Sequence, residues 1–433
     1  IPKGALEDYY ALLPFTCTGA QKRVLGEIWQ DLAKNSPMNR LVEGDVGCGK
    51  TAVAMGAAYG VARAGGQTVI MAPTELLATQ HYEFAKTVFG SRAALLKGAT
   101  TAKERQLLKE RIAAGDIDLV VGTHALLYTD LPFSNLSLVV TDEQHRFGVG
   151  QRAALLRGSA AAHMLIMSAT PIPRTLALVL YGKAEISVID QRPPGRKPVK
   201  THIVGQKKRK DLYNWLRERL AEGEKAYVVC PLVEKNEELE ALSVEEAAAG
   251  LKKFMKGYAV GVLHGRMSPE EKQTVMEGFR SGDIRLLVST TVIEVGMDVP
   301  DATVMVVESA DRFGLAQLHQ LRGRVGRGQA QAYCYLVSDG SGTERLKILK
   351  SSDDGFIIAE KDLQLRGSGQ LTGQRQHGKE GLICADLVRD VEVLREMGQL
   401  QEDLSEKLPE ESLVLTRSAI NKMQAGQAEV VLN

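Results

Sequence analysis

The stretch "GDVGCGKT" (44–51) contains the residue types that hold the phosphate chain of a nucleotide. It fits the pattern G-x-x-x-x-G-K-[ST], with a short apolar run before it and a helical pattern after it, as this kind of loop requires. Glycines let backbone N–H groups turn toward phosphate oxygens. The glycines of this stretch are Gly44, Gly47 and Gly49. Lys50 is expected to contact the β- and γ-phosphates, and Thr51 to offer its hydroxyl to Mg²⁺. The alternative, a glycine-rich turn with an incidental lysine, fits the flanking pattern less well.

Two adjacent carboxylates in "LVVTDEQHRFG" (138–148) match the second half of such a site. A nucleotide hydrolase with this loop needs an acidic partner for Mg²⁺ at the end of a neighbouring strand, and Asp142 stands where the apolar run ends. Glu143 is then placed to orient and deprotonate the attacking water. A separate metal site and a plain strand end are the alternatives. A lone histidine is more often a packed or surface residue, so His145 gains a role only from its neighbours.

A glutamine upstream of the phosphate loop is a candidate for recognising the base. In "LPFTCTGAQ" (13–21), Gln21 carries an amide that donates and accepts at once, which matches the N6/N7 edge of adenine. An isolated glutamine is usually just an exposed residue. Its place before the phosphate loop favours the adenine contact.

Arginines alternate with glycines in "QLHQLRGRVGRG" (317–328). Arg322, Arg324 and Arg327 at this spacing suit planar, bidentate contacts to phosphate oxygens. A solvated basic loop is the alternative, but the run follows "TTVIEVGMDVP" (290–300), and together they predict the far wall of a nucleotide cleft. One nucleotide would then touch both halves of the chain, and its hydrolysis would change their separation.

The elements that carry these residues form two alternating series, which predict an α/β fold with parallel sheets. The first series of apolar runs is 40–44, 68–72, 118–122, 136–140 and 163–168. The second series is 226–230, 259–263, 285–289, 303–308 and 332–337. The proline-rich stretch "DQRPPGRKPVKT" (190–201) between them is the linker candidate. We therefore expect two tandem domains, 1–190 and 191–340, followed by a mainly helical segment, 341–433. In "RMSPEEK" (266–272), Ser268, Pro269 and Glu271 predict a helix start with a capping box.

Composition excludes several classes of protein. The 433 residues suggest about two to three domains. The net charge of +1 gives no overall electrostatic footprint for nucleic acid. No apolar run approaches the roughly 20 residues that span a bilayer, so we expect a cytoplasmic protein with no membrane partner. Five scattered cysteines without a C-x-x-C pair argue against disulfides and against a zinc site.

The order of these motifs resembles that of superfamily 2 helicases, over most of residues 13–340. The resemblance rests on the following stretches: "TGAQ", "GDVGCGKT", "APTELLATQH" (72–81), "GTHALL" (122–127), "DEQH", "SATPIPRT" (168–175), "VLHGRM" (262–267), "TTVIEVGMDVP" and "QLRGRVGR". Within that superfamily, "DEQHRFGVGQR", "SATPIPRTLALVLYG", "IDQRPPGRKPV" and "DRFGLAQLHQLRGRVGRG" resemble the RecG family of bacterial fork-remodelling helicases. The Mfd family of transcription-repair coupling translocases shares much of this, but typically has two glutamates where this chain has Glu143 and Gln144.

The resemblance implies two RecA-like domains and an enzyme that uses ATP and Mg²⁺ to pull duplex DNA. It assigns Gln21 to adenine, Lys50 and Thr51 to phosphate and Mg²⁺, Asp142 to Mg²⁺ and Glu143 to water. It assigns Arg324 and Arg327 to the γ-phosphate, and Asp298 to the nucleotide. Coupling between nucleotide and DNA is expected at Ser168, Thr170 and Thr290, and phosphate contacts along the DNA at Thr74, Thr123 and His124. The stretch "EKDLQLRGSGQLTGQRQHG" (360–378) resembles the family's translocation motif, with Arg366 and Gln376 as its marker residues.

The same resemblance sets the expected partners. They are branched or forked duplex DNA, with single-stranded DNA-binding protein as a further candidate and no small molecule besides ATP. Family members carry a large N-terminal wedge domain, whereas this chain begins at Ile1 just before its first motif, so we expect a fragment of a longer bacterial protein associated with the nucleoid. An RNA helicase, an Mfd-like translocase and an ATP-gated clamp that binds without moving are the alternatives.

Overall fold

The computed structural model describes the following residues: 2, 4–34, 36–98, 100–123, 126, 131–142, 162–168, 184–193, 195, 197–231, 237–290, 299–340 and 343–366. The chain divides into two compact units. Unit 1 comprises Ile1–Ile172 and Lys183–Asp362, and unit 2 comprises Pro173–Gly182 and Leu363–Asn433. The helices and strands described below belong to unit 1, except that the last helix continues into unit 2 with residues 363–366. The three segments predicted from the sequence remain predictions.

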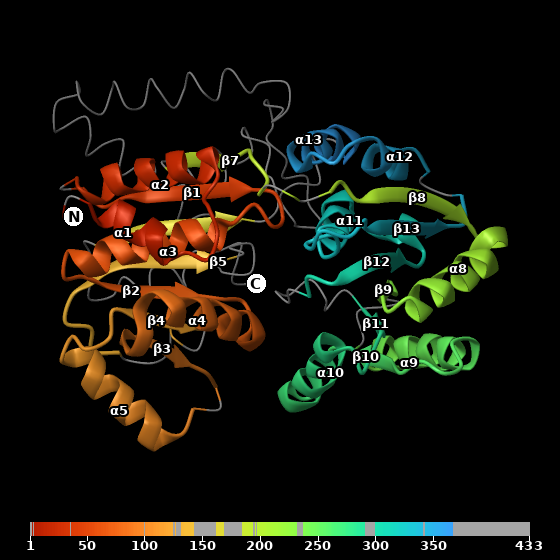
Figure 1. Cartoon of the computed structure of the whole chain (residues 1–433), viewed down its shortest axis with the longest axis horizontal. Helices are drawn as coiled ribbons and strands as arrows, with labels where there is room; N and C mark the ends of the chain where they lie inside the picture. The colour runs from red at the N-terminus through yellow and green to blue at the C-terminus, as the bar shows by residue number, and fades with distance from the viewer. Residues whose placement is uncertain are drawn as a thin grey trace, which may run out of the picture. The chain divides into compact units, whose positions relative to one another are not determined.

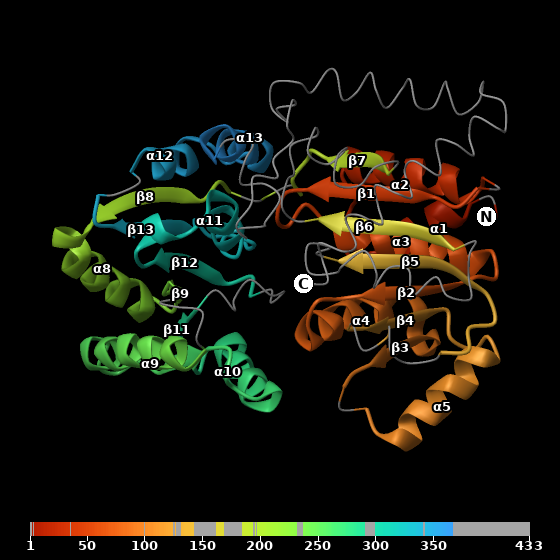
Figure 2. The ribbon, with the colours of Figure 1, turned by 180° about the vertical axis from the view of Figure 1, so that it is seen from behind.

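Sheet A has seven strands in the order β3-β4-β2-β5-β6-β1-β7, and neighbouring strands are parallel. Figure 2 shows β1, β5 and β6 running in the same direction. The strand bounds are β1 Asn39–Gly44, β2 Gln67–Met71, β3 Ala93–Leu96, β4 Leu119–Gly122, β5 Leu136–Asp142, β6 His163–Ser168 and β7 Glu185–Ile189. Strands β1, β2 and β5 are buried almost throughout, because helices cover both faces of a parallel sheet.

The helices of sheet A pack on two separate cores, and Figure 1 shows α2 and α3 across the face of the sheet that is turned to the viewer. Their bounds are α1 Ala5–Leu12, α2 Gly19–Leu32, α3 Lys50–Arg63, α4 Glu75–Phe89 and α5 Ala102–Ala113. Helices α2, α3 and α4 contribute Ile28, Met55 and Ala78 to the core on one face. Helix α5 contributes Leu108 and Ile112 to a separate core on the other face. The helices that flank the phosphate loop therefore share one continuous core.

Sheet B has six strands in the order β10-β11-β9-β12-β13-β8, and its neighbouring strands are also parallel. The strand bounds are β8 Lys200–Gly205, β9 Lys225–Val229, β10 Val260–Leu263, β11 Leu286–Ser289, β12 Ala302–Val307 and β13 Tyr333–Ser338. The helices are α8 Arg209–Ala221, α9 Glu237–Phe254, α10 Pro269–Ser281, α11 Leu315–Arg322, α12 Thr343–Ser351 and α13 Gly355–Arg366. Helices α8 and α9 pack on one face, and α10 to α13 pack on the other.

The predicted fold class is confirmed, since every apolar run of the two series overlaps a strand and α12 and α13 follow residue 340. The predicted capping box is also confirmed, because Ser268 Oγ accepts from the Glu271 N–H at 3.2 Å and Pro269 is the first residue of α10. Strands β3, β7 and β8 were not predicted. The end of the predicted linker 190–201 is wrong, since β8 begins at Lys200. None of the helices among the described residues is long and apolar enough to cross a membrane.

Candidate nucleotide site and its motor motifs

The loop between β1 and α3 has the backbone of a phosphate-binding loop. Gly47 and Gly49 have φ angles of 77° and 88°, in the left-handed region where a side chain is strained. A Cβ on Gly49 would also collide with the amide of Gln21, and a Cβ on Gly44 would collide with the Cys48 sulfur. Only glycine therefore fits these positions. The loop leads into the N-terminus of a 14-residue helix, the end that attracts anions.

Lys50 lies at the head of α3, with its ammonium over the loop. Lys50 Nζ donates to the carbonyl oxygen of Gly44 at 2.6 Å and to that of Asp45 at 3.1 Å. The positive charge therefore lies among the backbone groups that surround the predicted phosphate position. Thr51 follows in the first turn of α3 and is half-buried.

The carboxyl ends of β1, β5 and β6 meet at one edge of sheet A. Asp142 is the last residue of β5 and aligns with Met167 of β6, while Ser168 aligns with Glu43 of β1. Asp142 and Ser168 therefore lie along the same sheet edge as the phosphate loop. This is where a metal-binding carboxylate must stand if it is to reach a nucleotide held by that loop.

His81 of α4 holds Asp142, a contact that was not predicted from the sequence. His81 Nε2 lies 2.8 Å from Asp142 Oδ2, and the histidine is 4% exposed. Such a contact fixes the orientation of a carboxylate that binds a metal. The signal was within "APTELLATQH", which ends at His81, but the sequence alone does not pair it with a residue 61 positions away.

Gln21 is buried against the phosphate loop. Its Nε2 donates to the Cys48 carbonyl at 2.8 Å, and its Oε1 accepts from the Thr18 N–H at 2.8 Å in the capping box that begins α2. The amide thus connects the start of α2 to the loop. Its contact with adenine remains a prediction.

The arginine run has two structural roles. Arg322 is buried at the end of α11, where it donates to the carbonyl oxygens of Leu349 at 2.5 Å and Ser352 at 2.9 Å. It therefore fastens α11 to α12. Arg327 Nε donates to the Gly323 carbonyl at 3.3 Å, which closes the turn that carries Arg324.

Gly323 and His319 bring this run to the phosphate loop within unit 1. A Cβ on Gly323 would lie 2.7 Å from Val46 Cβ, so the Val46 side chain packs directly against the backbone of Gly323. His319 Nε2 lies 2.5 Å from Asp45 Oδ1, and Arg192 forms an ion pair with the same carboxylate at 2.8 Å. Burial alone would raise the pKa of Asp45, but His319 and Arg192 outweigh it and hold this pKa well below its usual range. Neither partner of Asp45 was predicted from the sequence.

Three family descriptions match the chain. "DEAD/DEAH box helicase" matches residues 18–179, "Helicase conserved C-terminal domain" matches 207–329, and "ATP-dependent DNA helicase RecG, domain 3, C-terminal" matches 352–423. The ATP-dependent DNA helicase RecG of Synechocystis sp. is 48% identical over 90% of this chain and 48% of its own length. The RecG of Thermotoga maritima is 48% identical over 94% of this chain and 53% of its own length. The chain belongs to the RecG helicase family.

A solved structure of RecG bound to a three-way DNA junction has the same fold. It matches with a TM-score of 0.75 and 45% sequence identity, over 91% of this chain and 52% of that one. A structure of yeast Dbp5 bound to RNA matches with a TM-score of 0.59 at 19% identity, which shows the shared fold alone. The chain spans about half the length of the RecG proteins named above.

The residues that the RecG resemblance assigns to DNA and to coupling lie at element ends. Thr74 Oγ1 accepts from the Leu77 N–H at 3.4 Å and begins α4. Thr123, Ser168 and Thr290 are buried just after or at the ends of β4, β6 and β11. Arg366 is the last residue of α13. The other assigned residues, Glu143, His124, Thr170, Asp298 and Gln376, lie outside the described residues.

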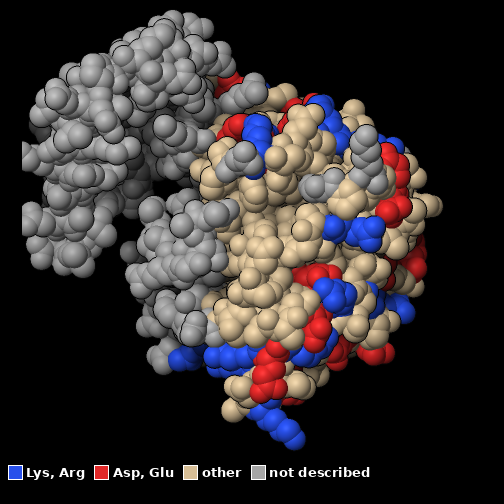
Figure 3. All heavy atoms as spheres, turned by 90° about the vertical axis from the view of Figure 1, so that its left-hand side faces the viewer, with Lys and Arg blue, Asp and Glu red and all other residues tan. Residues whose placement is uncertain are grey.

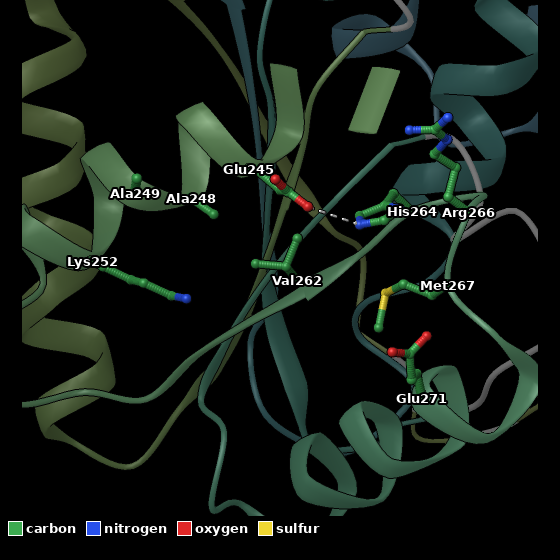
Figure 4. A pocket seen from close by; sticks show the side chains of 9 residues that line it. All are labelled: Glu245, Ala248, Ala249, Lys252, Val262, His264, Arg266, Met267 and Glu271. Atoms are coloured by element: carbon green, nitrogen blue, oxygen red, sulfur yellow. Dashed lines mark ion pairs between the residues drawn. The ribbon is translucent and has the colours of Figure 1, made fainter. Parts of the chain in front are cut away.

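The stretch "VLHGRM", one of the motifs that resemble superfamily 2 helicases, lines a pocket of about 690 Å³ beside α9 and β10 (Figure 4). His264 Nε2 forms an ion pair with Glu245 at 3.5 Å, and Arg266 lies beyond it. Lys252 and Glu271 line the pocket too. Acidic and basic side chains both line the pocket, so neither positive nor negative charge predominates in it.

One face of this RecG family member carries both signs of charge. In Figure 3, acidic and basic side chains lie next to one another around a broad uncharged area of the described surface. This agrees with the net charge of +1.

Proposed function

We propose that this chain is the motor of an ATP-dependent DNA translocase that remodels branched or forked duplex DNA in recombination and repair. The carrying observation is that Gly323 of the arginine run packs against Val46 of the phosphate loop, and that Asp142 ends a strand at the same edge of sheet A as that loop. Membership of the RecG family supports the choice of DNA. The proposal divides the chain into a first RecA-like domain (1–190), a second (191–340) and a helical segment (341–433).

We propose ATP and Mg²⁺ as the cofactors. The loop glycines and Lys50 would hold the phosphates, with Gln21 at adenine and Asp298 at the nucleotide. Thr51 and Asp142 would hold Mg²⁺, which needs only one or two protein oxygens because phosphates and waters supply the rest. Glu143 would activate water, and Arg324 and Arg327 would stabilise charge on the γ-phosphate.

DNA movement would depend on residues away from the phosphate loop. We propose that Thr74, Thr123 and His124 contact DNA phosphates, and that Ser168, Thr170 and Thr290 couple them to the nucleotide. Arg366 and Gln376 of the translocation motif would transmit domain closure to the duplex. Single-stranded DNA-binding protein is proposed as a partner, and the bacterial cytoplasm at the nucleoid, where the DNA substrate lies, as the location.

The test is the ATPase rate without polymer, with forked DNA, with linear duplex DNA and with RNA. The proposal expects stimulation by DNA, strongest with the fork, and none by RNA. Stimulation by RNA alone would support an RNA helicase instead. An equal ATPase rate in all four conditions would show that the chain is not a nucleic-acid motor. An Mfd-like translocase would respond equally to fork and linear duplex.

Replacing His81 with alanine is expected to weaken Mg²⁺ use. Asp142 would lose the buried contact at 2.8 Å that orients it, and losing such a partner typically costs about 10- to 100-fold in metal affinity or activity. The measurement is the Mg²⁺ concentration for half-maximal ATPase at saturating ATP. His81→Gln, which keeps a hydrogen-bonding group, should recover part of the loss. An unchanged Mg²⁺ requirement in His81→Ala would show that the histidine only fills space.

A further inference from the structure

Aromatic rings gather at β8, the edge strand of sheet B that lies at the opposite end of the strand order from β10. Tyr335 of β13 aligns with His202 of β8, and Tyr333 aligns with Lys200. The His202 and Tyr335 rings are stacked, with centroids 5.3 Å apart and planes 21° apart. The Tyr333 and Tyr335 rings lie 6.4 Å and 18° apart. We call His202, Tyr333, Tyr335 and Trp215 the edge cluster.

Trp215 of α8 packs against the two tyrosines of this row. Its ring stands edge-on to Tyr333 at 5.3 Å and to Tyr335 at 5.0 Å. Trp215 and the two tyrosines are half-buried, whereas His202 is exposed. Because β8 is the last strand of the sheet, the row ends in the exposed ring of His202, with one face against Tyr335 and the other turned outward.

Positive charge surrounds the exposed end of the row. Lys200 and Lys350 are exposed, and Lys200 Nζ lies 6.0 Å from the Tyr333 ring centroid. Within the described ranges neither lysine forms an ion pair with a carboxylate. After burial, these two lysines are the causes that lower the pKa of His202. Arg219 lies over Trp215 at 5.7 Å, but Glu222 and Glu224 neutralise it.

Packing alone explains part of the cluster. Trp215 and Tyr335 lie against the core under α8, and half-buried aromatic residues are ordinary at the rim of a core. This does not account for an exposed ring on the edge strand that stacks on Tyr335 and feels the charge of two lysines, neither of which has an acidic partner among the described residues.

We propose that the edge cluster binds single-stranded DNA. An unpaired base stacks on the outer face of His202 and extends the row, while Lys200 and Lys350 contact the flanking phosphates. Stacking tolerates every base because each has a flat face, and the lysines supply the salt-dependent part of the binding. The inference rests on the proposed function for its choice of polymer, since remodelling a branch exposes unpaired strands.

The experiment uses the full chain and a fluorescein-labelled oligothymidylate, with saturating unlabelled linear duplex to occupy the motor. Anisotropy gives Kd, and tryptophan fluorescence reports on Trp215 locally, against the background of Trp29. The variants are His202→Ala, His202→Phe and Lys350→Ala. Lys347→Ala, on the same helix α12 but paired with Glu344, is the matched control.

In the parent, we expect the bound oligothymidylate to quench the fluorescence of Trp215. His202→Ala should weaken binding of the oligothymidylate at least about fivefold and abolish this quenching, whereas His202→Phe should bind like the parent. Lys350→Ala should weaken binding and make the slope of log K against log salt shallower by about 0.7, the value for one phosphate on a single strand. Lys347→Ala should change neither quantity. Equal binding by His202→Ala and the parent overturns the proposal, and equal loss in His202→Ala and His202→Phe overturns stacking. Duplex-stimulated ATPase, measured on the same preparations, reports separately on the motor and should be unchanged in all variants.

Discussion

Replacing Arg324 with alanine is expected to lower ATP turnover by about 10³- to 10⁵-fold, the range for loss of an arginine finger. The turn that carries Arg324 begins at Gly323, whose backbone lies against Val46 of the phosphate loop. An arginine in this place stabilises charge that develops during hydrolysis and contributes little to ground-state binding. Nucleotide affinity should therefore stay close to that of the parent. Steady-state ATPase and equilibrium nucleotide binding measure the two quantities.

Two further variants make the Arg324 result specific. Arg312→Ala removes an exposed arginine that lies before α11, outside the run 317–328, and should leave turnover unchanged. Arg327→Ala tests the neighbouring candidate, which bonds the Gly323 carbonyl. If Arg324→Ala keeps turnover within a few-fold of the parent, the finger is Arg327 or neither arginine.

Lys50→Ala and Glu143→Gln are expected to separate nucleotide binding from hydrolysis. The Lys50 ammonium lies 2.6 Å from the Gly44 carbonyl, inside the loop, so its removal takes away the charge that attracts the phosphates and should abolish ATP affinity. Glu143→Gln should leave ATP bound, because it removes only the base that activates water, with a loss of about 10²- to 10⁴-fold in turnover. Nucleotide binding and single-turnover hydrolysis, compared in both variants, provide the test. Equal loss of affinity in the two would show that Glu143 has a different role.

The sequence predicted the central strands because burial on both faces makes them continuous apolar runs. The three strands that were missed, β3, β7 and β8, all lie at the edge of a sheet. β7 "EISVI" alternates between more and less buried residues, β3 "AALL" is short, and β8 begins inside a proline-rich stretch. A strand at an edge needs fewer apolar residues, so its periodicity is weak.

The phosphate loop and Asp142 could be placed from the sequence because each depends on local chain geometry at the end of a strand. The partners of these residues could not. His81 lies 61 positions from Asp142, and His319 lies 274 positions from Asp45. Those pairs form only through tertiary packing, which a pattern along the chain does not encode. The edge cluster went unpredicted for the same reason, since it depends on the alignment of β13 with β8.

Release of a labelled third strand from a DNA triplex tests most directly whether the chain moves along duplex DNA. The assay compares the parent with Lys50→Ala, Arg366→Ala and Gln376→Ala, each with ATP and Mg²⁺, on preparations whose DNA-stimulated ATPase is also measured. We predict that the parent releases the third strand only while it hydrolyses ATP, that Lys50→Ala releases none, and that Arg366→Ala and Gln376→Ala hydrolyse ATP without releasing it. If the parent hydrolyses ATP on DNA and leaves the triplex intact, the chain is a clamp and not a translocase.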